Sequence, residues 1–134
     1  MDRRRDSRRD VAYQDKQLVI RQTSQPLGLR LTGAVDDSNV EAVGGVLDST
    51  LKAHRGCDVH IDASGLDFVD VSGIRALVSA AERVDGGRHL ILYGVPPLIS
   101  KLMSVVGWTD MPALTISDSE FPDNGVQRSD DSVE

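Results

Sequence analysis

The chain has 134 residues, a net charge of -6 and a single cysteine, Cys57. This length suits one domain, and its composition, 40% hydrophobic and 27% charged, excludes a collagen-like or wholly disordered protein. A lone cysteine forms no internal disulfide, and the first residues lack a secretion signal. Because no apolar run reaches the roughly 18 residues of a membrane span, we expect a cytoplasmic domain that binds no membrane.

The two ends differ in composition from the middle of the chain. Residues 1–16 are mostly charged, and residues 117–134 carry six acidic residues against one arginine. Such segments bury too little apolar surface to offset the entropy that ordering costs. We therefore expect a disordered N-terminal arm, 1–16, and a disordered acidic tail, 117–134, in which Phe121 and Val126 are the isolated apolar residues. Aspartates among the arginines of the arm weaken its positive field, so we expect no nucleic-acid binding.

Between the ends, short apolar runs alternate with helical patterns. The expected strands are 18–23, 27–32, 59–61, 90–93 and 113–116. The expected helices are 38–51, 74–84 and 96–106, the first capped by Asp37 or Ser38 and the third with an apolar stripe of Leu98, Leu102, Val105 and Val106. The order β-β-α-β-α-β-α-β predicts an α/β protein with a mostly parallel sheet after an opening hairpin. Function is then expected at the carboxyl ends of the strands.

The segment 62–72 leads from the third strand into the clearest helix and is expected to be a loop. It holds three carboxylates and two hydroxyls, Asp62, Asp67, Asp70, Ser64 and Ser72. Ser72 has two interpretations, which do not exclude each other. As the helix N-cap it stabilises by about 1 kcal/mol. As an exposed hydroxyl it is reachable by a kinase, and its phosphate would lie at the positive end of the helix dipole.

The residues around Ser72 add expectations about this loop. Gly73 suggests an exposed turn with room for the close approach of another chain. Phe68 and Val69 are expected to pin the loop to the core or the sheet edge, with a contact surface as the alternative.

The sequence Asp-Phe-Val-Asp-Val-Ser-Gly-Ile, residues 67–74, resembles the signature of the STAS domain, the fold of bacterial anti-sigma factor antagonists. Gly33-Ala-Val-Asp36 and Gly94-Val-Pro-Pro-Leu resemble flanking motifs of that family, as does Gly107-Trp-Thr-Asp110. The resemblance covers residues 17–116 and agrees with the expected order of elements. Val71 replaces a frequent Ser or Thr, which leaves Ser72 as the hydroxyl at this turn.

The resemblance implies a switch in transcription regulation, with no enzymatic activity and no cofactor. The unphosphorylated protein binds an anti-sigma factor, which is an ATP-dependent serine kinase with a histidine-kinase-like fold, and frees a sigma factor. That kinase phosphorylates Ser72, and a metal-dependent serine/threonine phosphatase resets the switch. The residues expected to bind the partner are Asp36, Asp67, Asp70, Val71, Ser72, Gly73 and Arg75.

Other functions remain as alternatives. One is a STAS scaffold or transporter-associated module without a phosphorylation cycle. A remote one is a receiver-like phosphoaspartate switch at Asp62, with Asp36 and Asp37 as Mg²⁺ ligands, although the spacing of the elements is against it. Hydrolase chemistry is disfavoured because the chain has no Gly-x-Ser-x-Gly motif and no evident base for Ser72. No His or Cys pair has metal-binding spacing.

Overall fold

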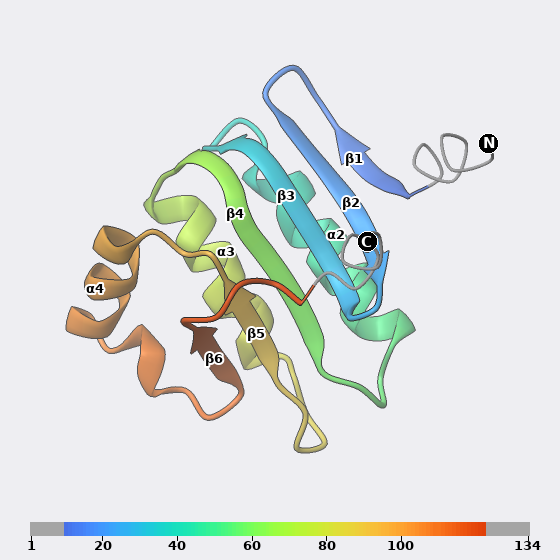
Figure 1. Ribbon diagram of the computed structural model, residues 1–134, viewed down its shortest axis with the longest axis vertical. Coiled ribbons are helices and arrows are strands. Elements are labelled where there is room, and N and C mark those ends of the chain that lie inside the picture. The colour runs from blue at the N-terminus through green and yellow to red at the C-terminus, as the bar shows by residue number, and fades with distance from the viewer. Residues whose placement is uncertain (1–9, 123–134) are drawn as a thin grey trace, which may run out of the picture.

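The computed structural model describes residues 10–122, in which a six-stranded mixed sheet is covered by helices on one face (Figure 1). The strands are β1 (Val11–Gln14), β2 (Leu18–Ser24), β3 (Leu27–Val35), β4 (Val59–Val69), β5 (Leu90–Tyr93) and β6 (Leu114–Ser117). The helices are α2 (Val40–Ala53), α3 (Val71–Glu82) and α4 (Pro97–Val105), with a 3-10 turn, η1 (Trp108–Asp110). Strand order follows chain order; β1 to β3 pair antiparallel and β3 to β6 parallel. The predicted α/β class is confirmed.

The core lies between the sheet and the helices α2 and α3. Leu29 and Leu31 of β3 are buried, while Arg30 between them points to the other face, as the two-residue repeat of a strand requires. On α2 the buried positions include Val43 and Leu47, four residues apart, so one helical face meets the sheet. The sheet therefore has a helix-covered face and an opposite face that no helix in residues 10–122 covers (Figure 1).

Two segments expected outside the fold contribute to it. The predicted N-terminal arm was to extend to residue 16, but Val11–Gln14 form β1 and pair with β2. In the predicted tail, Phe121 contacts the ring of Tyr93. Both expectations failed because strand pairing in the first case and a ring contact in the second hold short segments that have no apolar periodicity. The rest of the arm, 1–9, and of the tail, 123–134 with Val126, lies outside the described residues.

Strand β4 is much longer than the predicted 59–61, and most of the expected loop belongs to it. Asp and Gly disfavour strands, yet pairing with β3 continues to Val69 through two register shifts. A β-carbon on Gly65 would lie 3.1 Å from the carbonyl oxygen of Leu31, so glycine fits the close approach of the two backbones. Tertiary pairing has overridden local propensity here.

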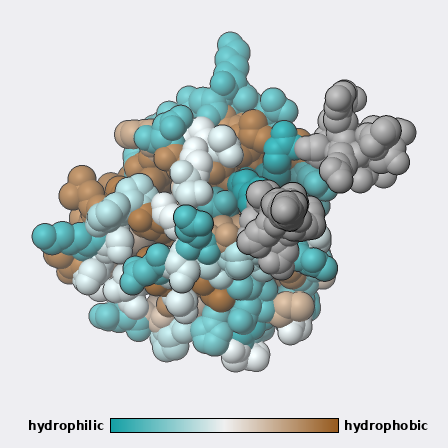
Figure 2. All heavy atoms as spheres, in the orientation of Figure 1, coloured by the Kyte–Doolittle hydropathy of each residue, from teal (hydrophilic) through white to brown (hydrophobic). Residues whose placement is uncertain are grey.

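The predicted stripe of α4 points to solvent instead of the sheet. Leu98 is 77% and Val105 76% exposed, and Leu102 and Val106 are also exposed. Met103 is buried, and Ile99 packs against the core. Figure 2 shows hydrophobic residues on the left of the molecule, where α4 lies. The helix has apolar residues on two sides, and the side with Ile99 and Met103 faces the core. No helix within residues 10–122 is long and apolar enough to span a membrane.

Candidate functional site

The turn between β4 and α3 is organised by Asp70. This residue is the N-cap of α3, and its Oδ1 accepts hydrogen bonds from the Gly73 N–H at 3.1 Å and from the Ser72 hydroxyl at 2.6 Å. The prediction that Ser72 is the N-cap is therefore wrong, because the helix already begins at Val71. Ser72 occupies the second helical position and holds the cap in place.

Gly73 is buried, contrary to the exposed turn that was expected. A β-carbon there would lie 2.7 Å from the Cγ2 of Val69 and 2.8 Å from the Cγ1 of Val35. The missing side chain thus lets the first turn of α3 pack directly onto β3 and β4. This close packing sets the position of the neighbouring Ser72 relative to the carboxyl ends of β3 and β4.

Two exposed apolar side chains lie shortly before Ser72 in the chain. Phe68 is 54% and Val71 52% exposed, whereas Val69 packs against the core. The expectation that the segment is pinned is correct for Val69 and wrong for Phe68. The charged side chains of Asp67 and Arg75 are exposed on either side of the turn. A surface with both apolar and charged groups around a partly buried hydroxyl is suited to protein contact.

Asp36 follows β3 just as Asp70 follows β4. The last residues of the two strands, Val35 and Val69, pair with each other, and the Asp70 N–H donates to the Val35 carbonyl at 3.2 Å. The carboxyl ends of β3 and β4 thus bring Asp36 and Asp70 to the same edge of the sheet, beside Ser72.

The loop after Asp36 contains residues that the sequence did not single out. The cap of α2 is Asn39, not Asp37 or Ser38; its buried side chain bonds to the Asp36 N–H and the Ala34 carbonyl. Hydrogen bonds from Ser38 lower the pKa of Asp36. Asp15, within the expected arm, accepts a bond from Asn39. The one feature of the sequence that could have indicated Asp15 is its position just before the first apolar run.

Asp62 lies far from this edge. It pairs with Arg30, six residues before Asp36 along β3, which places it about 20 Å from the strand end at roughly 3.3 Å per residue. The receiver-like arrangement of Asp62 with Asp36 and Asp37 is therefore wrong. Within the part of the chain that the structure describes, no group of three or more His, Cys, Asp or Glu residues is placed to hold a metal ion.

Known structures share this fold. An anti-sigma factor antagonist from Mycobacterium paratuberculosis superposes with a TM-score of 0.60 at 13% identity, covering 73% of this chain and 83% of that one. The unphosphorylated anti-sigma factor antagonist SpoIIAA gives a TM-score of 0.60 at 14% identity, covering 81% and 94%. An anti-sigma-factor antagonist (STAS) domain protein from Planctomyces limnophilus gives 0.58 at 16%, covering 76% and 89%.

At these identities the structures establish the fold. No curated protein matches the sequence significantly. The family model described as "Mlab, STAS domain" matches residues 18–115, which includes β2 to β5, the start of β6 and the whole turn around Ser72. By its sequence and by its fold, the chain belongs to the STAS domain family.

Proposed function

We propose that this protein is an anti-sigma factor antagonist whose unphosphorylated form binds an anti-sigma factor serine kinase and frees a sigma factor. The observation that carries this proposal is the Ser72 hydroxyl, which Asp70 holds in the first turn of α3, directly after a segment in which Phe68 and Val71 are exposed. The similar solved structures named as anti-sigma factor antagonists support it.

Phosphorylation of Ser72 ends the interaction. The Ser72 Oγ bonds to the γ-phosphorus of ATP held by the partner kinase, ADP leaves, and the hydroxyl proton is released. The Asp70 carboxylate, 2.6 Å from the Oγ, is the first acceptor for that proton. A metal-dependent serine/threonine phosphatase hydrolyses the phosphoserine and restores the binding form.

The charge of the phosphate explains the direction of the switch. Phosphate adds about -1.5 to -2 charges at neutral pH, next to Asp70 and at the edge that carries Asp36. In a docked interface these charges are desolvated and repel one another, which weakens the complex. In the free protein they are solvated, and the N-terminus of α3 and Arg75, three positions along the helix, stabilise them. The switch thus acts on affinity and leaves the fold intact.

The test is phosphorylation and binding with candidate anti-sigma factor kinases, for example those encoded beside this gene. With ATP and the cognate kinase, mass spectrometry should place the phosphate on Ser72. Ser72→Ala should stay bound in the presence of ATP, and Ser72→Glu should bind at least about tenfold more weakly, or roughly 1.4 kcal/mol.

Ser64→Ala is the matched control, because Ser64 also donates to an aspartate two residues earlier at 2.6 Å. This variant should be phosphorylated and released like the natural protein. Equal affinity of Ser72→Ala and Ser72→Glu for the partner would contradict the proposal. Stable binding of partners without any phosphate transfer would instead indicate the scaffold or transporter-associated module.

A further inference from the structure

The sheet face opposite α2 and α3 carries a row of side chains, one from each of four strands. In the register of the sheet, Arg30 of β3 pairs with Asp62 of β4, Asp62 with Tyr93 of β5, and Tyr93 with Ser117 of β6. Neighbouring strands lie about 4.8 Å apart, so these residues form one line across the parallel half of the sheet.

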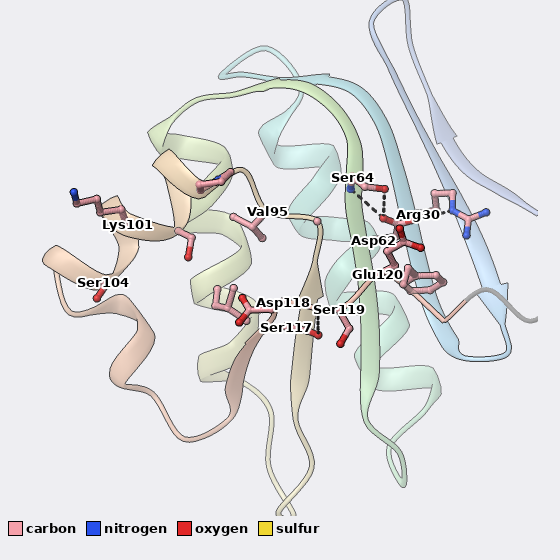
Figure 3. Close-up of a pocket in the computed structure, with 15 residues that line it drawn as sticks. Arg30, Asp62, Ser64, Val95, Lys101, Ser104, Ser117, Asp118, Ser119 and Glu120 are labelled. Atoms are coloured by element: carbon pink, nitrogen blue, oxygen red, sulfur yellow. Dashed lines mark hydrogen bonds and ion pairs between the residues drawn. The ribbon is translucent and has the colours of Figure 1, made fainter.

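Hydrogen bonds fix the side chains of this row. The Arg30 Nε lies 3.0 Å from the Asp62 Oδ2, and the Ser64 hydroxyl donates to the Asp62 Oδ1 at 2.6 Å (Figure 3). The Tyr93 hydroxyl lies 2.6 Å from the His60 Nδ1, and the two rings stack with centroids 5.6 Å apart. Asp62 is only 5% exposed. The row is therefore a preorganised surface, in which a buried carboxylate holds a guanidinium in position.

The chain itself covers this row after β6 ends. Beyond Ser117, residues 118–122 turn back and cross in front of β5 and β4 towards β3 (Figure 1). The Phe121 ring meets the Tyr93 ring edge-on at 5.2 Å, and the Arg30 guanidinium lies 5.3 Å from the Phe121 centroid. Both geometries are favourable for an aromatic ring, edge-on to another ring and facing a cation. One aromatic side chain thus anchors the segment to both ends of the Arg30–Asp62–Tyr93 line.

A cavity of about 790 Å³ adjoins these contacts. It lies between the segment, the sheet and α4, and its cationic side chains are Arg30 and Lys101, while Asp118 and Glu120 of the segment line the same cavity (Figure 3). The segment therefore offers an aromatic ring and nearby carboxylates to a surface that offers aromatic rings and cations. Phe121 joins the two sides through its contacts with the Tyr93 ring and the Arg30 guanidinium.

We propose that this sheet face is a second docking surface, which takes extended protein segments carrying an aromatic residue next to carboxylates, and that residues 118–122 occupy it as a tethered ligand. This surface is separate from the Ser72 turn, since Asp62 precedes the end of β4 by seven residues, or about 23 Å at roughly 3.3 Å per residue. A partner segment of the same chemistry binds by displacing Phe121. Because a short tether gives an effective concentration in the millimolar range, only a segment with additional contacts displaces it efficiently.

The test uses the full chain and the capped peptide Ser-Asp-Ser-Glu-Phe-Pro, which has the sequence of residues 117–122. Phe121→Ala frees the surface, so millimolar peptide should shift the backbone NMR signals of Arg30, Asp62 and Tyr93 in this variant. The natural chain should bind the peptide at least about fivefold more weakly, because its own segment competes. The same peptide with alanine in place of phenylalanine should not bind.

Phe68→Ala is the matched control, since it removes the other phenylalanine of the chain, at the Ser72 turn, and leaves Phe121 in place. It should bind the peptide as weakly as the natural chain does. Equal peptide affinity of the natural chain and Phe121→Ala would overturn the proposal, as would shifts confined to other surfaces or no shift in Phe121→Ala. These outcomes do not depend on the phosphorylation of Ser72, so this proposal and the proposed switch fail separately.

Discussion

Two of the Asp-x-Ser sequences in this chain, at Asp62 and at Asp70, have the same local geometry and different surroundings. At Asp62 and at Asp70, the serine two residues later donates its hydroxyl to the Oδ1 at 2.6 Å. Asp62 lies in the sheet, almost fully buried and paired with Arg30, whereas Asp70 begins a helix. The same local motif therefore serves as part of a buried ion pair within the sheet at Asp62 and as a helix cap at Asp70, where we propose that the serine is modified.

The largest expected effect concerns how tightly the Ser64 region is packed. Gly94 has φ +73°, and a β-carbon there would lie 2.5 Å from the Cβ of Ser64 and 2.7 Å from its backbone nitrogen. Gly94→Ala should destabilise by about 3 kcal/mol, from left-handed strain together with the clash. Gly86→Ala, with φ +68° and no atom within 4 Å, should cost about 1 kcal/mol. Urea unfolding measures both, and equal losses would contradict the close packing at Ser64.

The second prediction compares the two aspartates directly. Asp62→Ala removes the partner of Arg30 and the acceptor of two donors on Ser64, so it should cost about 2 kcal/mol. Asp70→Ala removes a helix cap and should cost about 1 kcal/mol. The unfolding free energies from chemical denaturation test the order. If Asp70→Ala proved the more destabilising, the assignment of Asp62 as the structural carboxylate would be wrong.

The smallest effect is a pH dependence of the unfolding free energy, caused by His60, which stacks on Tyr93 on the sheet face opposite α2 and α3. Burial lowers the pKa of His60 below its usual 6.5, outweighing the opposite influence of Asp58. As the pH falls, His60 is therefore protonated in the unfolded chain before it is protonated in the folded protein. The contribution of His60 to stability is complete above about pH 6.5. It is lost as the pH falls through the lowered pKa.

His60→Gln should accordingly lose less stability than the natural chain between pH 7.5 and 5.5, as measured by urea unfolding at both values. An NMR titration of the His60 ring gives the pKa itself. A titration midpoint above 6.5, or equal losses in the two proteins, would refute the prediction. Binding at the Ser72 turn should not follow this titration, because His60 lies on β4 near its start.

The fold could be predicted where local pattern and tertiary packing agree. The strand Leu90–Tyr93 is an uninterrupted apolar run, and the positions Ile74, Leu77, Val78 and Ala81 are buried as their helical spacing predicts. Prediction failed where pairing partners are distant in the sequence. The extension of β4 depends on β3, more than thirty residues earlier, and the local propensities of Asp and Gly are against it.

α4 shows a second limit, because its sequence has apolar residues on two sides. Spacing identifies both the row with Leu98 and the row with Met103, and only the position of the helix beside the sheet selects the one that is buried.

The candidate site was predicted in part. The carboxyl ends of adjacent parallel strands bring Asp36 and Asp70 together, as the order of elements implied. The cap of α3 was placed two residues late, because apolar periodicity begins at Ile74 while the helix begins at Val71. Asp15 and Asn39 escaped notice because their contact spans 24 residues and crosses from the end of β1 to the start of α2. A polar contact between residues so far apart produces no periodic pattern in the sequence.

The strand order of the sheet has a consequence for how the protein folds. Each strand pairs with its predecessor in the chain, so no pairing has to wait for a segment from the far end. Folding rates fall as contacting residues become more distant in sequence. In this sheet β1, β2 and β3 can assemble as two successive hairpins, whereas each parallel pair from β3 to β6 closes over the helix that lies between its two strands in the chain. During synthesis the sheet can grow one strand at a time, in the order in which the ribosome releases them.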